Sequence, residues 1–278
     1  MIMSPIPTES GFARIGNAKL YYEVAGTGPP FVMLHAGVAD SRQWNHEFTR
    51  FATHFRTIRY DLRGYGKSEP VDGAFSHMGD LMALLDRLEI RERLVIMGCS
   101  MGGSVAMDFA LAHPSRVTAL IMVDAGPSGL KLDVQPHPKA AEAEEAYHAG
   151  QLDRVAELET QIWFDGMGRT AQQVNQAMRT LAYDMNRLGL AHDAKRLGTR
   201  VPDAATPAAE RLARLAMPVL VIVGSHDTPY MLAAAGSMVQ QIRSARQAIL
   251  EDAAHLSNMD QPDAFERIVT TFLDDLPG

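Results

Sequence analysis

The stretch GCSMG places a serine between two glycines, a spacing that can present a nucleophile. Gly98 and Gly102 flank Ser100 in the pattern G-x-S-x-G, directly after an apolar run and before a segment of helical period. A tight strand-to-helix turn leaves no room for bulky flanking residues and exposes the serine at the end of the strand. Free N–H groups at the start of the next helix could stabilise a developing negative charge. The pattern alone also fits an ordinary glycine-rich connection.

A serine nucleophile needs a base, and the base needs an acid that orients it. Asp227 and His255 follow Ser100 in the chain, each just past an apolar run that predicts a strand. Both would project from C-terminal strand ends, where ligands bind in open α/β sheets. Each has a structural alternative: Asp227 could be a helix N-cap before Pro229, and His255 could be a core histidine. The order Ser, Asp, His favours a catalytic triad.

Three neighbours of these residues could compete for the same roles. Asp124 also follows an apolar run and is a second candidate for the acid. His226 precedes the acid Asp227, which favours a loop residue. Cys99 occupies the x position of the turn, which faces away from the exposed serine edge, so we expect a small packing residue.

The stretch GYGKS, Gly64–Ser68, resembles part of a phosphate-binding loop. A Walker A match would need glycine at position 61, where Asp61 stands, so we reject that interpretation. We expect a turn that glycine permits, with Arg63 and Asp61 as structural pairing residues.

Composition limits the class of protein. The chain has 278 residues, is 46% hydrophobic and 21% charged, and carries a net charge of −7, which gives no attraction to nucleic acid or to anionic membranes. Its single cysteine excludes an intramolecular disulfide and fits a reducing compartment. The N-terminus shows no secretory signal, and no apolar run approaches a membrane span. We expect a cytoplasmic protein, with a homo-oligomer left open.

Seven apolar runs rich in Val, Ile, Leu and Tyr predict strands, separated by helical segments such as 77–90 and 101–113. This alternation predicts an α/β fold: a mostly parallel, twisted sheet of approximately eight strands with helices on both faces. The predicted strands are Lys19–Ala25, Pro30–His35, Phe55–Asp61, Arg93–Gly98, Thr118–Ala125, Pro218–Gly224 and Arg246–Glu251.

The interval from Pro127 to Met217 lacks a convincing strand. Helix formers dominate two pieces of it, Glu142–Phe164 and Gln173–Ala191. Because the interval is several times longer than a usual connection, we predict a helical cap at 127–217, inserted into a core domain of 1–126 and 218–278. The alternative is two more crossover helices.

Four blocks of sequence resemble the serine hydrolases of the α/β-hydrolase superfamily, and the resemblance covers nearly the whole chain. It implies Ser100 as nucleophile, His255 as general base and Asp227 as orienting acid. It also implies an oxyanion hole from the backbone N–H groups of Met101 and Gly37, although Ala36, where the family usually has glycine, leaves the choice between Ala36 and Gly37 open. The blocks are LHAGVADSRQW (34–44), YDLRGYGKSEP (60–70), GCSMGG (98–103), and the pair VGSHD and DAAHLSNMDQP.

Within the superfamily, LHAG, RYDLRG and AHLSNMDQP are most similar to the 3-oxoadipate enol-lactonase branch. A serine at the turn speaks against dehalogenases and epoxide hydrolases, and HLSNMDQP lacks the tryptophan usual in carbon–carbon bond hydrolases. We therefore expect a carboxylesterase- or lactonase-like enzyme that cleaves a small-molecule ester or lactone through an acyl-enzyme. The resemblance implies no metal and no organic cofactor. The alternatives are a cofactor-free perhydrolase or haloperoxidase, a carbon–carbon bond hydrolase with the same triad, and a non-catalytic ligand sensor.

Substrate choice would depend on the cap. Some apolar residues of the predicted cap are candidates for contact with the substrate, but they could instead pack the cap onto the sheet. A lactone that carries a carboxylate would require a cationic partner, but the cationic candidates could instead be solvated at the surface. The apolar candidates are Trp163, Phe164, Tyr183 and Met185, and the cationic ones are Arg169, Arg179 and Arg187.

Overall fold

The computed structural model describes residues 6–276, where strands and helices alternate along the chain. The strands are β1 (Thr8–Ile15), β2 (Ala18–Ala25), β3 (Pro30–Leu34), β4 (Arg56–Tyr60), β5 (Ala74–Phe75), β6 (Leu94–Cys99), β7 (Val117–Val123), β8 (Thr199–Arg200), β9 (Val219–Gly224) and β10 (Ala245–Leu250). The helices are α1 (Asn45–Phe51), α2 (His77–Arg87), α3 (Met101–Ala112), α4 (Ala140–His148), α5 (Leu152–Thr160), α6 (Gln176–Asp193), α7 (Pro229–Gln241), α8 (Ser257–Asp260) and α9 (Pro262–Asp274).

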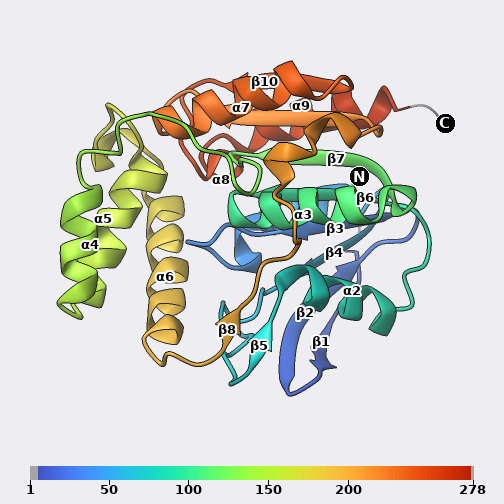
Figure 1. Cartoon of the computed structure of the whole chain (residues 1–278), viewed down its shortest axis with the longest axis horizontal. Helices are drawn as coiled ribbons and strands as arrows, with labels where there is room; N and C mark the ends of the chain where they lie inside the picture. Colours follow the sequence, from blue (N-terminus) through green and yellow to red (C-terminus); the bar gives the residue numbers. More distant parts are fainter. Residues whose placement is uncertain (1–5, 277–278) are drawn as a thin grey trace.

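Eight strands form one sheet in the order β1-β2-β4-β3-β6-β7-β9-β10 (Figure 1). The pairs from β4 to β10 are parallel, whereas β1 and β2 run antiparallel to their neighbours. The predicted mostly parallel sheet of about eight strands is confirmed. Strand β1 was not among the predicted runs, because most of its side chains are exposed and it lacks an apolar stretch.

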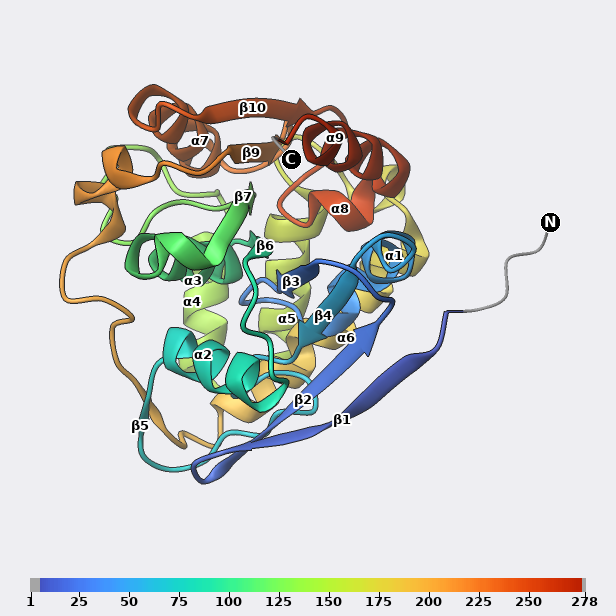
Figure 2. The ribbon, with the colours of Figure 1, turned by 90° about the vertical axis from the view of Figure 1, so that its right-hand side faces the viewer.

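The central strands are buried on both faces, which explains their nearly continuous apolar sequences. Alternate residues of β3 enter different clusters: Val32 and Leu34 contact the layer of α2, α3 and α7, while Phe31 and Met33 contact the layer of α1 and α9. Figure 2 shows these two helical layers on opposite sides of the sheet. Within residues 6–276, the helices lack the combination of length and apolar character that crossing a membrane requires.

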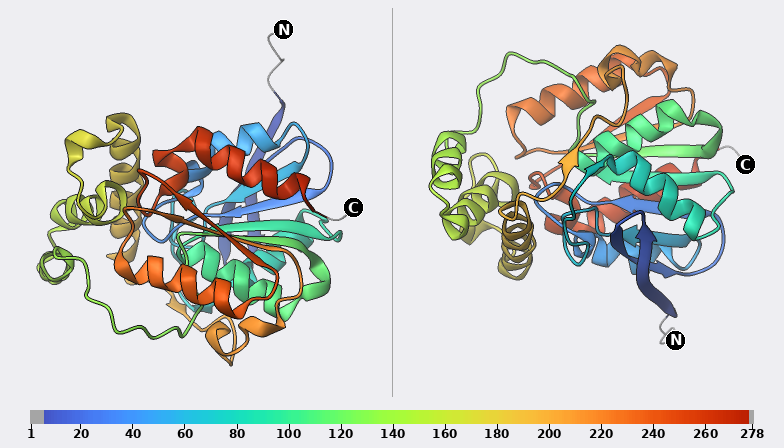
Figure 3. Two further views of the ribbon diagram at one scale, coloured as in Figure 1. Left: turned by 90° about the horizontal axis from the view of Figure 1, so that it is seen from above. Right: turned by 60° about the horizontal axis from the view of Figure 1, so that its bottom comes forward.

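Helices α4, α5 and α6 lie together beside the sheet (Figures 1 and 3). The first predicted helical piece is divided at Gly150, whose φ of +69° favours glycine, and it ends in a π-helical turn at Gln161–Asp165. The expectation of no strand between 127 and 217 is wrong in one detail, because the two-residue strand β8 pairs with β5. The later stretch 208–217 packs into the main core through Ala208, Leu212, Leu215 and Met217. The cap boundaries of 127 and 217 remain a prediction.

Candidate active site

Ser100 lies in a strained turn between β6 and α3. Its φ of +50° and ψ of −114° are unusual for a residue with a side chain, and such strain at functional sites costs about 1–3 kcal/mol. A Cβ atom on Gly98 would lie 2.3 Å from the carbonyl oxygen of Gly102, and one on Gly102 would lie 2.4 Å from that of Leu34. Both flanking residues must therefore be glycine, and the turn leaves Ser100 half-buried.

Cys99, the neighbour of Ser100, is fully buried. Its thiol donates to the carbonyl oxygen of His255 at 3.5 Å. Burial and the nearby Asp124 raise the pKa of this thiol well above its usual value, which keeps it protonated and unreactive. Cys99 thus packs against the histidine-bearing loop, as expected for a small packing residue.

The structure brings Asp227 and His255 together. The loops that carry them follow β9 and β10, which are parallel neighbours and end side by side at Gly224 and Leu250. Nδ1 of His255 lies 2.9 Å from Oδ2 of Asp227, and both side chains are almost completely buried. The alternative of Asp227 as a helix N-cap is wrong, because Thr228 caps α7.

Asp124, the rival acid, has different partners. Its carboxylate accepts the backbone N–H of Gly224 at 2.8 Å and the hydroxyl of Ser257. Burial and the charge of Asp227 raise the pKa of Asp124 well above its usual value. Asp124 therefore ties together the two loops that hold Asp227 and His255, and it is the carboxylate of Asp227 that pairs with Nδ1 of the histidine ring.

The loop after β3 distinguishes the two candidates for the second backbone donor. The N–H of Ala36 donates to Oε1 of Gln43 at 2.9 Å in the protein interior. Gly37 faces the helix N-terminus: a Cβ atom placed on it would lie 3.7 Å from Cβ of Met101. Because the N–H of Ala36 is engaged, Gly37 is the residue of the two that can offer a donor beside Met101.

A buried polar network supports this loop, and sequence reasoning missed it. Nε2 of Gln43 donates to Oδ1 of Asn258 at 3.1 Å, and Nδ2 of Asn258 donates to Oε2 of Glu47, also at 3.1 Å. Burial raises the pKa of Glu47 to about 8. Asn258 belongs to the motif that carries His255, so the network connects the histidine loop to the loop of Ala36.

Of the four apolar cap candidates, Trp163 reaches the proposed triad. Its ring centroid lies 4.5 Å from that of His255, with the rings inclined by 45°. Phe164 and Met185 are buried in the hydrophobic cluster that includes β3 and α9, which is a packing position. Tyr183 is half-buried on α6. Their roles in substrate binding remain predictions.

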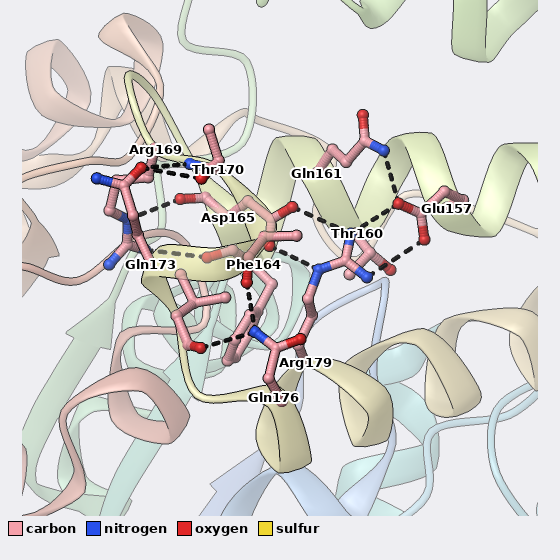
Figure 4. Close-up of polar contacts among 12 residues, drawn as sticks. Glu157, Thr160, Gln161, Phe164, Asp165, Arg169, Thr170, Gln173, Gln176 and Arg179 are labelled. Atoms are coloured by element: carbon pink, nitrogen blue, oxygen red, sulfur yellow. Dashed lines mark hydrogen bonds and ion pairs between the residues drawn. The ribbon is translucent and has the colours of Figure 1, made fainter.

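The three cationic candidates, Arg169, Arg179 and Arg187, are paired with acidic side chains. The side chain of Arg169 is 8% exposed and pairs with Asp260 at 2.6 Å. It also donates to the backbone carbonyls of Phe164, Asp165 and Asp252. Arg179 lies between Glu157 and Asp165 (Figure 4). Arg187 pairs with Asp153.

These contacts attach the π-helical turn to the loops that carry Asp227 and His255. Arg169 holds the turn to the loop of His255. Met167 and His226 exchange two hydrogen bonds, N–H to carbonyl at 2.7 Å and ring Nδ1–H to carbonyl at 2.8 Å, which join the turn to the loop of Asp227. His226 is thus a loop residue with a structural contact.

The stretch Gly64–Ser68 forms the expected turn. Gly64 and Gly66 have φ values of +88° and +50°, and the carboxylate of Asp61 accepts the backbone N–H of Lys67 at 2.7 Å. Arg63 forms a buried bidentate ion pair with Asp80, its shorter contact being 2.6 Å. Asp61 and Arg63 therefore stabilise the turn through separate partners.

Two cavities adjoin the candidate site. A mixed polar cavity of about 230 Å³ is lined by Met101, Tyr65, His77 and Arg200. Burial and the charge of Arg200 lower the pKa of His77 to about 3, so its ring is neutral. A second cavity of about 300 Å³ is lined mainly by apolar side chains, including Trp163.

One group in the described part of the chain has a geometry that could hold a cation. Ligand atoms of His46, Asp263 and Glu266 lie within 4.8 Å of one another. Glu266 already pairs with His46 at 2.8 Å and with Arg50 at 2.9 Å. Its charge is compensated by these neighbours, so the group is explained as a surface ion-pair cluster.

Comparison with known proteins identifies the family. A model of the alpha/beta hydrolase family matches residues 31–268. The chain is 30% identical to a 2-hydroxy-6-oxononadienedioate/2-hydroxy-6-oxononatrienedioate hydrolase of Paraburkholderia xenovorans, over 95% of each chain, and 28% identical to 3-oxoadipate enol-lactonase 1 of Acinetobacter baylyi, over 88% of each. It is similar in fold to the enol-lactonase of Burkholderia xenovorans, with a TM-score of 0.77 and 24% identity, over 95% of this chain and 100% of that one. The resemblance to enol-lactonases is confirmed, and the protein belongs to the α/β-hydrolase family.

Proposed function

We propose that this hydrolase cleaves a small carboxylic ester or lactone through Ser100, His255 and Asp227. The observation that carries the proposal is the buried 2.9 Å contact between Asp227 and His255. It is combined with the strained turn at Ser100, whose neighbour Cys99 contacts the same histidine. This arrangement supports the proposal that His255 is the base and Asp227 its acid, because both follow strand ends on the sheet edge where the turn of Ser100 lies.

The proposed reaction proceeds in two halves. Asp227 accepts a hydrogen bond from Nδ1–H of His255, which leaves Nε2 unprotonated, and Nε2 takes the proton of Ser100 as the serine oxygen attacks the carbonyl carbon. The N–H groups of Gly37 and Met101 stabilise the oxyanion. His255 then gives the proton to the leaving oxygen, and water releases the acyl group from Ser100 by the reverse sequence of proton transfers.

The test is turnover of p-nitrophenyl acetate by matched serine variants. We expect Ser100→Ala to lower kcat by at least about 1,000-fold, in line with the loss of a triad nucleophile. Ser104→Ala, on the first turns of the same helix, serves as the control and should keep normal activity. Substantial activity in Ser100→Ala would overturn the proposal, and a single burst without further turnover in the unmodified protein would favour a ligand sensor.

A second candidate is hydrolysis of a carbon–carbon bond by the same residues. The 30% identity to a 2-hydroxy-6-oxononadienedioate hydrolase favours it. This candidate predicts that the protein consumes 2-hydroxy-6-oxo-dienoates, measured as loss of their dienoate absorbance. The reaction should depend on Ser100 and have a higher kcat/KM than ester hydrolysis. Perhydrolase or haloperoxidase chemistry would instead require halogenation that depends on both bromide and peroxide.

A further inference from the structure

The cavity of about 300 Å³ beside Trp163 is lined mainly by apolar side chains. We call it the apolar pocket and define it by Leu132, Val134, Ala140, Ile162, Trp163 and Met231. Among the described residues that line it, none is an Asp, Glu, Lys or Arg. Burial lowers the pKa of His137 at its rim, so that ring is neutral as well. Such a surface favours an uncharged, apolar group.

The chain segment after β7 builds one wall of the apolar pocket. Leu132 and Val134 are half-buried, whereas their neighbours Lys131 and Asp133 are exposed. This alternation of two is that of extended backbone, which directs alternate side chains to the same side. The hydroxyl of Tyr230 donates to the carbonyl of Leu130 at 2.9 Å and so fixes the segment to the first turn of α7.

Two residues that line the apolar pocket, Trp163 and Thr228, neighbour the histidine and its acid. Trp163 lines the pocket and also lies against His255, with a centroid distance of 4.5 Å. Thr228, which lines the pocket as well, directly follows Asp227. The mixed polar cavity instead adjoins Met101, on the side of the proposed oxyanion donors. The residues that line the two cavities therefore neighbour different parts of the proposed reacting centre.

We infer that the apolar pocket binds the alcohol portion of an ester whose alcohol is a small, uncharged alkyl or aryl group. This inference rests on the proposed function. As the bond between Ser100 Oγ and the acyl carbon forms, the bond from that carbon to the alkoxy oxygen breaks. The proton taken from Ser100 passes through His255 to the alkoxy oxygen. The leaving oxygen must therefore lie at His255, and the rest of the alcohol extends toward Trp163.

The first experiment compares two ester series. One series keeps acetate and lengthens the alcohol from methyl to butyl; the other keeps methanol and lengthens the acyl group from acetate to pentanoate. We expect kcat/KM to rise about three- to fourfold per methylene in the alcohol series, the gain from burying one CH₂, and to rise less in the acyl series. A flat alcohol series with Ser100-dependent hydrolysis, or a gain confined to the acyl series, would overturn the inference alone.

Adjacent alanines supply a matched pair of variants. Ala140 lines the apolar pocket, whereas Ala141, the next residue of α4, is exposed. Ala140→Phe should reduce kcat/KM for butyl acetate to about that for methyl acetate, while methyl acetate itself changes less than about threefold. Ala141→Phe should resemble the unmodified protein. Equal effects of the two substitutions on butyl acetate would contradict the assignment.

A binding measurement is independent of turnover. The chain has two tryptophans, and Trp44 is buried with its indole nitrogen unpartnered among the described residues, so Trp44→Phe breaks no hydrogen bond there. In that variant, butan-1-ol should change Trp163 emission in a saturable way, and Ala140→Phe should abolish the response. Absence of saturation would overturn the pocket assignment. If the alcohol saturates but no ester is hydrolysed in a Ser100-dependent manner, the proposed function fails and the alcohol-site role fails with it.

Discussion

The backbone N–H of Ala36 donates to the side-chain oxygen of Gln43 at 2.9 Å. Gln43 in turn is held by Asn258, three residues after His255. The residue that replaces the family's usual glycine is thus engaged in the protein interior, and the next residue, Gly37, lies beside Met101. The N–H of Ala36 therefore holds the loop, and the N–H of Gly37 is the proposed oxyanion donor. Single substitutions at the two positions can test this proposal separately.

Replacing Gly37 by proline removes its N–H group. We expect kcat for ester hydrolysis to fall roughly 100- to 1,000-fold, the usual cost of losing one oxyanion donor, while KM changes little. Ala36→Gly should stay within about threefold of the unmodified protein, because it leaves the N–H bond to Gln43 intact. Thermal melting of both variants controls for folding. Equal loss of kcat in the two variants would contradict the assignment of Gly37.

Glu47 should make stability depend on pH. Its pKa is about 8 in the folded protein, raised by burial from an ordinary 4.5. Between these values the folded state holds a proton that the unfolded state has released, so the free energy of unfolding falls as pH rises from about 4.5 to about 8. Glu47→Gln removes this dependence, and its advantage over the unmodified protein should grow by roughly 3 kcal/mol between pH 5 and pH 8.

Urea unfolding at the two pH values measures this difference. Other titrating groups contribute to both proteins and cancel in the comparison. Glu145→Gln, at an exposed glutamate of α4, should differ from the unmodified protein equally at pH 5 and pH 8. An equal difference for Glu47→Gln at both values would show that Glu47 is ionised in the folded state.

Arg169 should matter far more to stability than Arg187. Arg169→Met leaves the buried carboxylate of Asp260 without its cation, which costs about 3–5 kcal/mol at buried pairs. Arg187 pairs with the exposed Asp153, and Arg187→Met should cost less than about 1 kcal/mol. Urea denaturation gives both values. If Arg169→Met lowered the free energy of unfolding as little as Arg187→Met does, the contacts of Arg169 would add little to the attachment of the π-helical turn.

Substitution of two glycines by alanine, at Gly102 and Gly236, should have opposite effects. Gly102→Ala would place Cβ 2.4 Å from the Leu34 carbonyl oxygen, so the turn must shift, and kcat/KM should fall about 100-fold or more. Gly236 lies within α7 with open space around a would-be Cβ. Gly236→Ala should raise the free energy of unfolding by about 0.5–1 kcal/mol without changing activity. Full activity in Gly102→Ala would contradict the described geometry of the turn.

Much of the fold could be predicted from the sequence, because the central strands are buried on both faces and their apolar runs are continuous. The same runs predicted that Asp227 and His255 follow strand ends, and the parallel pairing of β9 and β10 brings them together. Strand β1 was not predicted because most of its residues are exposed and do not form an apolar run.

Contacts between residues distant in sequence could not be predicted. The placement of Trp163 on His255 depends on how the π-helical turn is attached through Arg169 and Met167. The choice between Ala36 and Gly37 depends on the direction of one N–H bond, which the sequence does not encode locally. The cavities arise from three separate segments and have no sequence motif of their own.

The central claim is that Ser100 is the nucleophile, and the most direct measurement is to map the adduct formed with a fluorophosphonate by peptide mass spectrometry. We predict one adduct per chain, on Ser100, absent in Ser100→Ala and formed much more slowly in His255→Gln. An adduct on another residue, or none in a protein that still hydrolyses esters, would contradict the account.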